Sequence, residues 1–319
     1  FGRKMKTLLC VHTDLDGLGC WMVLDYFNIY YDEVLLCDYN RFEDEKEYNN
    51  LLNFDKIIMT DYSVSAEIVE KLLKENKEVL IIDHHLNDQT ELLQKIKNEN
   101  FEYVFDNTKS GTMLCYDYFK PKNVRLKKTM FQFVELVDTY DLFKKEHPLW
   151  EEAQNMNRVL YGCLSWNADT VEEKYMFIKD YWFNKINKFN EWFWSEFEQK
   201  KIKSAIDKEN KQFNESKACF KKFVDDKGIP FGVTVAKSKV SIVATRLLEE
   251  FKDIKYIAII NNYSGQWDKI SLRSRTSEEF DCNSFEECKG HDCAAGGEVK
   301  PTFAANLYKG MINLTYKEN

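Results

Sequence analysis

The sequence predicts an α/β protein, and three observations favour this class. Short apolar runs rich in β-branched residues alternate with longer segments whose apolar residues recur at helical spacing. The segments between the runs are long enough for the crossover helices that parallel strands require. The chain has 319 residues, of which 44% are apolar, and this is enough for two domains that each bury their own core.

The expected N-terminal domain spans residues 5–147 and contains a parallel sheet. Its expected strands are residues 7–11, 34–37, 56–60, 78–82 and 103–105, and its clearest helices are residues 17–28, residues 66–75 and a helix that starts near Gly111. Because a helical segment separates most of these strands, we expect right-handed crossovers.

Residues 148–228 are expected to form a helical linker region. Residues 172–213 carry aromatic side chains at spacings of three or four, which predicts an amphipathic helix. Two interpretations stay open: the aromatic side chains pack against the domains, or some of them line the active site and stack on bases.

Residues 229–319 are expected to form a smaller α/β domain, with the active-site cleft between it and the first domain. The expected strands are residues 231–235, 256–260 and 269–273, and the expected helices are residues 240–250 and 304–312. Pro148 and the glycine and proline near residue 229 mark the domain boundaries.

Several apolar runs of the first domain end in acidic residues or histidines. The first is followed by His12, Asp14 and Asp16, the third by Asp61 and the fourth by Asp83, His84 and His85, while a later run contains Asp138 and Asp141. The ends of parallel strands meet at one edge of the sheet, where α/β proteins bind ligands. A single aspartate there is typical of a turn or a helix N-cap, but caps do not require histidines.

So many carboxylates at one edge would repel one another without counterions. Two divalent metal ions would remove this repulsion. Mixed carboxylate and imidazole ligands suit Mn²⁺, and Mg²⁺ or another divalent metal fits the same ligand types.

The composition excludes several classes of protein. The net charge of −8 argues against binding of long duplex nucleic acid, which normally requires a basic face. No apolar run approaches about 18 residues and no signal-peptide pattern precedes the first strand, so we expect no membrane association. The nine cysteines are scattered through apolar runs, as in cytoplasmic proteins with free thiols. Cys282, Cys288, His291 and Cys293 lack the spacing of a standard zinc site.

Five motifs resemble those of a known superfamily. His12-x-Asp14-x-Asp16-Gly17, Asp61, Asp83-His84-His85 and Asp138 resemble the four motifs of the DHH phosphoesterases. The run from Ser271 to Arg275, followed by the run from Gly290 to Gly297, resembles the glycine-rich motif of the DHH-associated domain, although only one glycine follows Lys289. The resemblance covers residues 7 to 315. It implies a dinuclear Mn²⁺ site that hydrolyses phosphodiester or phosphoanhydride bonds and a second domain that holds the substrate.

The resemblance also implies a role for each motif residue. One metal ion would be held by His12, Asp14 and Asp61, and the other by Asp16, Asp61, His84 and Asp138. Asp141 is the alternative to Asp138. In the catalytic set, Asp61 would bridge the ions, Asp83 would orient a histidine, and His85 would stabilise or protonate the scissile phosphate. The substrate would contact Arg273, Arg275, Gly290, His291, Gly296 and Gly297, and the backbone amides around these glycines would form a nest for a phosphate.

The motif spacing looks closer to RecJ-like nucleases than to family II inorganic pyrophosphatases. Because the chain is acidic and too short to add the OB domain of bacterial RecJ, we expect a short single-stranded oligonucleotide substrate, hydrolysed exonucleolytically to nucleoside 5′-monophosphates. The alternatives are a RecJ-like single-strand exonuclease, a hydrolase of cyclic nucleotides or of 3′-phosphoadenosine 5′-phosphate, and a non-catalytic nucleotide sensor. The sequence also leaves a homodimer open.

Overall fold

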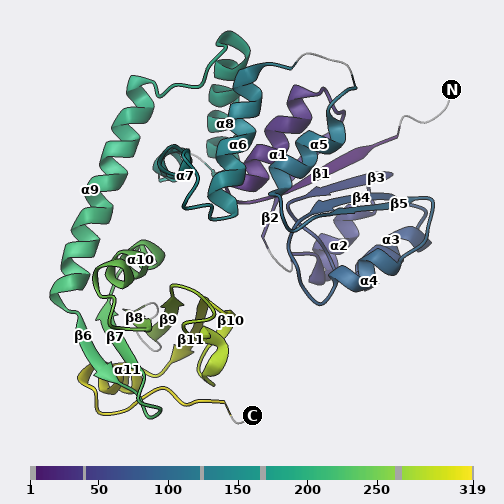
Figure 1. The fold of residues 1–319 in the computed structure, drawn as a ribbon. Coiled ribbons are helices and arrows are strands. Elements are labelled where there is room, and N and C mark those ends of the chain that lie inside the picture. The colour runs from purple at the N-terminus through teal and green to yellow at the C-terminus, as the bar shows by residue number, and fades with distance from the viewer. Residues whose placement is uncertain (1–4, 39–40, 123–125, 166–169, 263–267, 318–319) are drawn as a thin grey trace. The chain divides into compact units, whose positions relative to one another are not determined.

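We describe a computed structural model that covers residues 5–38, 41–122, 126–165, 170–262 and 268–317. The chain divides into two compact units, residues 1–202 and residues 203–319 (Figure 1). Each unit is described by itself, so the predicted cleft between the domains stays a prediction. Among the described residues, no helix is both long enough and apolar enough to cross a membrane.

The first unit contains a five-stranded parallel sheet in the order β2-β1-β3-β4-β5. Its strands are β1 (Thr7–His12), β2 (Glu33–Cys37), β3 (Lys56–Thr60), β4 (Glu78–Asp83) and β5 (Phe101–Phe105). The chain moves from β1 to β2 on one side and then returns to place β3 on the other side of β1. This reversal makes a topological switch point between β1 and β3, where open α/β sheets bind ligands.

Helices cover both faces of this sheet (Figure 1). One core contains residues of α1 (Leu15–Tyr26), α5 (Gly111–Phe119), α6 (Lys128–Asp141), α7 (Trp150–Leu164) and α8 (Val171–Lys188), and the other contains residues of α2 (Glu45–Leu51), α3 (Ala66–Lys74) and α4 (Thr90–Lys95). Along β1, Leu9 and Val11 enter the first core, while Leu8 and Cys10 enter the second. Strands covered on both faces appear as continuous apolar runs, which is why the sequence revealed them.

The predicted helical region contains α7, α8 and α9 (Glu196–Ala218), but residues 189–195 interrupt the stretch expected to be one helix. Lys185 connects α8 to the residues that follow the break. Its buried ammonium pairs with Glu198 and donates to the carbonyl oxygen of Phe193 at 2.8 Å. The aromatic side chains divide into two groups: Trp182 is buried, whereas Phe177 and Phe189 are exposed. Their stacking on bases stays a prediction.

The second unit contains a mixed six-stranded sheet in the order β10-β11-β9-β8-β7-β6. Its strands are β6 (Lys221–Val224), β7 (Pro230–Val235), β8 (Tyr256–Asn262), β9 (Asp268–Ser274), β10 (Lys289–His291) and β11 (Ala294–Val299), and its helices are α10 (Val240–Glu250) and α11 (Pro301–Lys309). Among the described strands of this second sheet, only β7 and β8 pair in parallel. The α/β class is therefore confirmed for the chain.

The second sheet begins before the predicted boundary at residue 229. Strand β6 is an edge strand that pairs with β7, and most of its residues are exposed. An exposed edge strand with two lysines has no continuous apolar run, so the sequence did not reveal it.

Candidate metal centre

The carboxyl ends of β1, β3 and β4 bring the N-terminal motifs together. His12 is the last residue of β1, Asp61 follows β3, and Asp83 ends β4 directly before His84 and His85. Since β3 pairs with both β1 and β4, these residues lie on one edge of the sheet at the switch point, as the sequence predicted.

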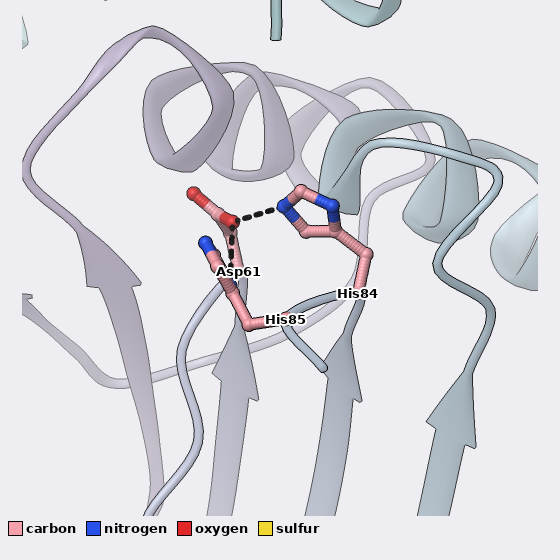
Figure 2. Close-up of side chains that lie close together, drawn as sticks. All are labelled: Asp61, His84 and His85. Atoms are coloured by element: carbon pink, nitrogen blue, oxygen red, sulfur yellow. Dashed lines mark hydrogen bonds and ion pairs between the residues drawn. The ribbon is translucent and has the colours of Figure 1, made fainter. Parts of the chain in front are cut away.

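Asp61 lies at the centre of the cluster (Figure 2). Its Oδ1 lies 3.2 Å from Nε2 of His84 and 3.7 Å from Nδ1 of His85, and its Oδ2 lies 3.6 Å from Nδ1 of His12. The side chain is 1% exposed, and the backbone is left-handed with φ of 52°. Such a conformation is uncommon outside glycine and concentrates at functional sites.

Three overlapping sets of side chains have their ligand atoms within 4.8 Å of one another. They are Asp61 with His84 and His85, His12 with Asp14 and Asp61, and Asp16 with His84 and Asp141. Asp61 and His84 each belong to two of the sets, so the cluster is continuous.

The last turn of α6 brings Asp141, rather than Asp138, into the cluster. Asp141 Oδ2 lies 3.4 Å from Nε2 of His84. Asp138 instead accepts a hydrogen bond from the backbone N–H of Ser110 at 2.8 Å and pairs with the ammonium of Lys144. Residues three apart lie on nearly the same face of a helix, so the sequence could not separate them. We therefore replace Asp138 by Asp141 in the candidate ligand set.

Asp16 is held by the N-terminus of α5, a contact that the sequence analysis missed. The backbone N–H groups of Gly111 and Thr112 donate to its two carboxylate oxygens at 2.6 and 2.8 Å, and the Thr112 hydroxyl donates to the Asp16 carbonyl oxygen at 2.8 Å. A helix N-terminus stabilises a carboxylate in this way. The signal was present in the Ser110-Gly111-Thr112 run at the start of the expected helix.

Asp14 and Asp83 hold the rings of His12 and His85. Asp14 caps α1 by accepting from the N–H of Gly17 at 2.9 Å, and its other oxygen lies 2.8 Å from Nδ1 of His12. Asp83 Oδ1 accepts from the N–H of His84 at 2.8 Å and lies 2.8 Å from Nδ1 of His85. Asp83 therefore orients the His85 ring.

Three carboxyl groups in the cluster are difficult to ionise. Burial, followed by the charges of Asp16 and Asp14, holds the pKa of Asp61 well above its usual range. Burial and the same two neighbours raise the pKa of Asp141 to about 9. Burial also raises the pKa of Asp16, although the nearby His84 opposes this effect. Without a cation, the charged form of each of these groups is disfavoured.

The pKa values of the neighbouring His84 and His85 shift in opposite directions. Burial lowers the pKa of His84, which favours the neutral imidazole that binds metal ions. For His85, burial also acts to lower the pKa, but the hydrogen bond and charge of Asp83 outweigh it and raise the pKa. The shifts therefore suit His84 as a ligand and His85 as a proton donor.

The cluster fits divalent cations. Among the described residues, Asp61 Oδ2 and Asp141 Oδ2 are buried without a hydrogen-bond partner. Leaving such oxygens uncompensated is costly, and metal ions would ligate them. Carboxylate and imidazole donors in this proportion suit Mn²⁺ and related divalent metals.

The predicted substrate residues of the second unit differ in what surrounds them. Arg273, in β9, donates to the Leu272 carbonyl at 2.7 Å and to the Ser241 hydroxyl at 3.2 Å. Arg275 pairs with Glu279 at 2.7 Å and donates to the carbonyl oxygens of Leu248 and Ile254. These contacts occupy Arg275 and favour a structural role, so we leave it out of the substrate site.

The glycines of the second unit lie inside strands. Gly290 pairs with Ala295, Gly296 pairs with both Lys289 and Ser271, and Gly297 pairs with Ile270. A Cβ at Gly297 would lie 1.7 Å from the Glu287 carbonyl oxygen, so this glycine permits a close backbone approach. The backbone of these glycines belongs to the sheet ladder, and a phosphate nest formed by their amides stays a prediction. His291 lies in β10, but its side chain is outside the described residues.

Comparison with known proteins identifies the first unit. Residues 6–139 match the family model described as "DHH family, N-terminal domain". The first unit therefore carries a DHH-family N-terminal domain, as the motifs predicted. Over 84 residues, a quarter of this chain, the sequence is also 38% identical to the UPF0122 protein FN1394 of Fusobacterium nucleatum, 79% of which is covered. The name of that protein states no activity.

Three solved structures share the fold over most of the chain. A pGpG-specific phosphodiesterase from Vibrio cholerae is 13% identical, with a TM-score of 0.59 over 96% of this chain and 97% of that chain. The DHH domain of a protein assigned to a family of ribosomal proteins is 13% identical, with a TM-score of 0.61 over 98% and 87% of the two chains. Exonuclease RecJ bound to manganese is 12% identical, with a TM-score of 0.51 over 96% and 89%.

Proposed function

We propose that this DHH protein is a metal-dependent phosphodiesterase that hydrolyses short oligonucleotides from one end to nucleoside 5′-monophosphates. The observation that carries the proposal is the buried cluster of carboxylates and imidazoles around Asp61 at the switch point of the sheet. The fold is shared with a pGpG-specific phosphodiesterase and with a manganese-bound exonuclease, which supports this reaction class.

The chain supplies ligands for two Mn²⁺ ions. His12, Asp14 and Asp61 would hold one, and Asp16, His84 and Asp141 would hold the other, with Asp61 shared. Bound divalent ions supply positive charge that activates water and stabilises the phosphoryl oxygens. The N-terminus of α5 keeps Asp16 in place, so that ligand needs little rearrangement.

His85 is proposed to protonate the leaving oxygen. Its pKa is raised because Asp83 accepts a hydrogen bond from the ring and stabilises the imidazolium. His85 is also more exposed than His84, with 34% against 10% of the side chain accessible. A protonated and accessible imidazole beside the cluster can transfer a proton to a ribose oxygen.

Arg273 is proposed to bind a phosphate of the substrate. Burial lowers the pKa of its guanidinium, which means that its charge lacks full compensation. Among the described residues Arg273 forms no ion pair with a carboxylate, in contrast to Arg275. A guanidinium with free donor capacity suits bidentate phosphate binding.

The substrate class follows from charge and from the shared fold. A chain with a net charge of −8 has little general attraction for long nucleic acid. The pGpG-specific phosphodiesterase that shares the fold acts, by its printed name, on a dinucleotide. RecJ is named an exonuclease, so single-strand digestion is the second candidate.

A substrate panel tests the proposal. We would incubate the protein and Mn²⁺ with 5′-labelled oligonucleotides of 2 to 20 residues, cyclic dinucleotides and 3′-phosphoadenosine 5′-phosphate, and compare the rates. We expect oligonucleotides of 2 to 5 residues to be fastest, with loss of at least roughly a hundredfold in Asp61→Asn, because that change removes the shared carboxylate. Equal or faster digestion of 20-mers would favour the RecJ-like function, and a fully active Asp61→Asn would contradict the site.

A further inference from the structure

The turn after α6 holds an exposed aromatic side chain in an unfavourable backbone conformation. Phe143 is 57% exposed, and its backbone is left-handed with φ of 52°. Bulky side chains rarely adopt this conformation. Hydrogen bonds from the N–H of Phe143 to the Tyr140 carbonyl at 3.1 Å and from the N–H of Lys144 to the Thr139 carbonyl at 3.0 Å hold the turn. Such strain persists where the surrounding structure imposes it, often at ligand sites.

Other side chains brace the Phe143 ring. Trp150 lies edge-on to it, with ring centroids 5.1 Å apart and planes at 87°. Trp150 itself stacks on Tyr140 at 6.1 Å and 11°. The Lys145 ammonium lies 4.5 Å from the Phe143 ring centroid. The ring is therefore accessible but supported, as a stacking surface requires.

The turn is attached to the metal centre. Phe143 follows Asp141 by two residues, and two residues of chain span at most about 7 Å. Lys144 pairs with Asp138, and Asp138 also accepts from the N–H of Ser110 beside the residues that hold Asp16. Phe143 therefore lies within about 7 Å of chain from a candidate metal ligand.

The charge of the turn suits an anionic ligand. Lys145 places an ammonium group against the Phe143 ring, while the ammonium of Lys144 pairs with Asp138, in a chain whose net charge is −8. An aromatic ring next to cations is the combination that proteins use for nucleotides: the base stacks on the ring, and the cations attract the phosphate.

We propose that Phe143 and Lys145 form a nucleoside-binding subsite beside the metal centre. The base of a nucleotide that flanks the scissile phosphate stacks on Phe143, and Lys145 attracts the backbone phosphate. Because every base has a stacking face, the subsite predicts affinity for nucleosides with little sequence preference. This inference rests on the proposed phosphodiesterase function and names how its substrate is held.

A binding experiment tests the subsite independently of turnover. The probe is a dinucleotide with a methylenephosphonate linkage, which keeps its charge but cannot be hydrolysed. Two analogues are used beside it, each of which lacks one of the two bases. Titration calorimetry with Mn²⁺ measures Kd. We expect Phe143→Asn to weaken binding of the dinucleotide roughly tenfold, because one base loses its stacking partner. Binding of the analogue that lacks this base should not change.

The variants are chosen to keep the fold intact. Asparagine tolerates the left-handed conformation, so Phe143→Asn should keep the turn, and Phe143→Trp should keep the affinity. The matched control is Phe131→Ala. It removes another exposed aromatic ring, near the start of α6, the helix that precedes the turn. This variant should leave Kd unchanged.

An unchanged Kd for the dinucleotide in Phe143→Asn would overturn the subsite, as would an equal loss of affinity for the dinucleotide and both analogues. A wild-type protein that does not bind the dinucleotide would also overturn it. The proposed function fails on a different observation, namely that the wild-type protein with Mn²⁺ hydrolyses no substrate of the panel.

Discussion

At the scale of single residues, Asp61 combines features that are unfavourable without a ligand. It is buried and left-handed, and it lies among carboxylates that raise its pKa. A carboxylate used only as a helix cap requires none of the three. The same reasoning separates Asp141, whose Oδ2 has no hydrogen-bond partner among the described residues, from Asp138, which contacts both Ser110 and Lys144.

The two aspartates of α6 should therefore respond differently to substitution. We expect Asp141→Asn to weaken Mn²⁺ binding at least roughly tenfold, because it removes a ligand charge. We expect Asp138→Asn to keep Mn²⁺ binding and to destabilise the fold by about 1 kcal/mol, because it weakens the contact with Lys144. Calorimetric titration and thermal unfolding measure the two effects. The reverse outcome would restore Asp138 as the ligand.

At the scale of elements, the site depends on three strand ends and one helix N-terminus. The candidate ligands lie at one edge of the sheet, at the ends of β1, β3 and β4. The N-terminus of α5 donates two backbone hydrogen bonds to Asp16. The close approach of α5 requires Gly111, since a Cβ there would lie 2.8 Å from Cβ of Asp61 and 3.0 Å from Oδ2 of Asp16.

Gly111→Ala should therefore damage the metal centre. We expect Mn²⁺ affinity and turnover to fall roughly tenfold or more, because Asp61 and Asp16 must both move. Gly162→Ala in α7 is the matched control, because its Cβ would meet only the flexible side chain of Lys201, at 3.3 Å. The control should keep full activity and change stability by less than about 1 kcal/mol. Unchanged metal affinity in Gly111→Ala would contradict this role of α5.

At the scale of the whole molecule, metal binding and pH should be coupled to folding. In the metal-free protein the pKa of Asp141 is raised to about 9, while an unfolded aspartate titrates near about 3.9. The folded state then binds more protons than the unfolded state between these values, so stability falls as pH rises through this range. Divalent ions bound at the proposed site would replace those protons and so bind more tightly at higher pH.

Thermal unfolding checks this coupling. We expect Mn²⁺ to raise Tm, by an amount that corresponds to about 2.7 kcal/mol at a concentration a hundredfold above Kd. At one fixed Mn²⁺ concentration, the increase should be larger at pH 8 than at pH 6, because fewer protons compete for Asp61 and Asp141 at the higher pH. In Asp141→Asn, the increase in Tm caused by Mn²⁺ should depend less on pH. An increase in Tm that is independent of pH would show that these carboxyl groups do not bind the metal.

The sequence by itself determined the α/β class, the strands of the first sheet and most of the cluster. Buried parallel strands need continuous apolar runs, and metal ligands need carboxylates and imidazoles at strand ends, so both leave local patterns. Only the tertiary structure shows that Asp141, rather than Asp138, lies beside His84. It also shows that Arg275 pairs with Glu279 and that Gly111 lies against Asp61. Those outcomes depend on which distant atoms meet, and the spacing of residues along one chain carries no information about such contacts.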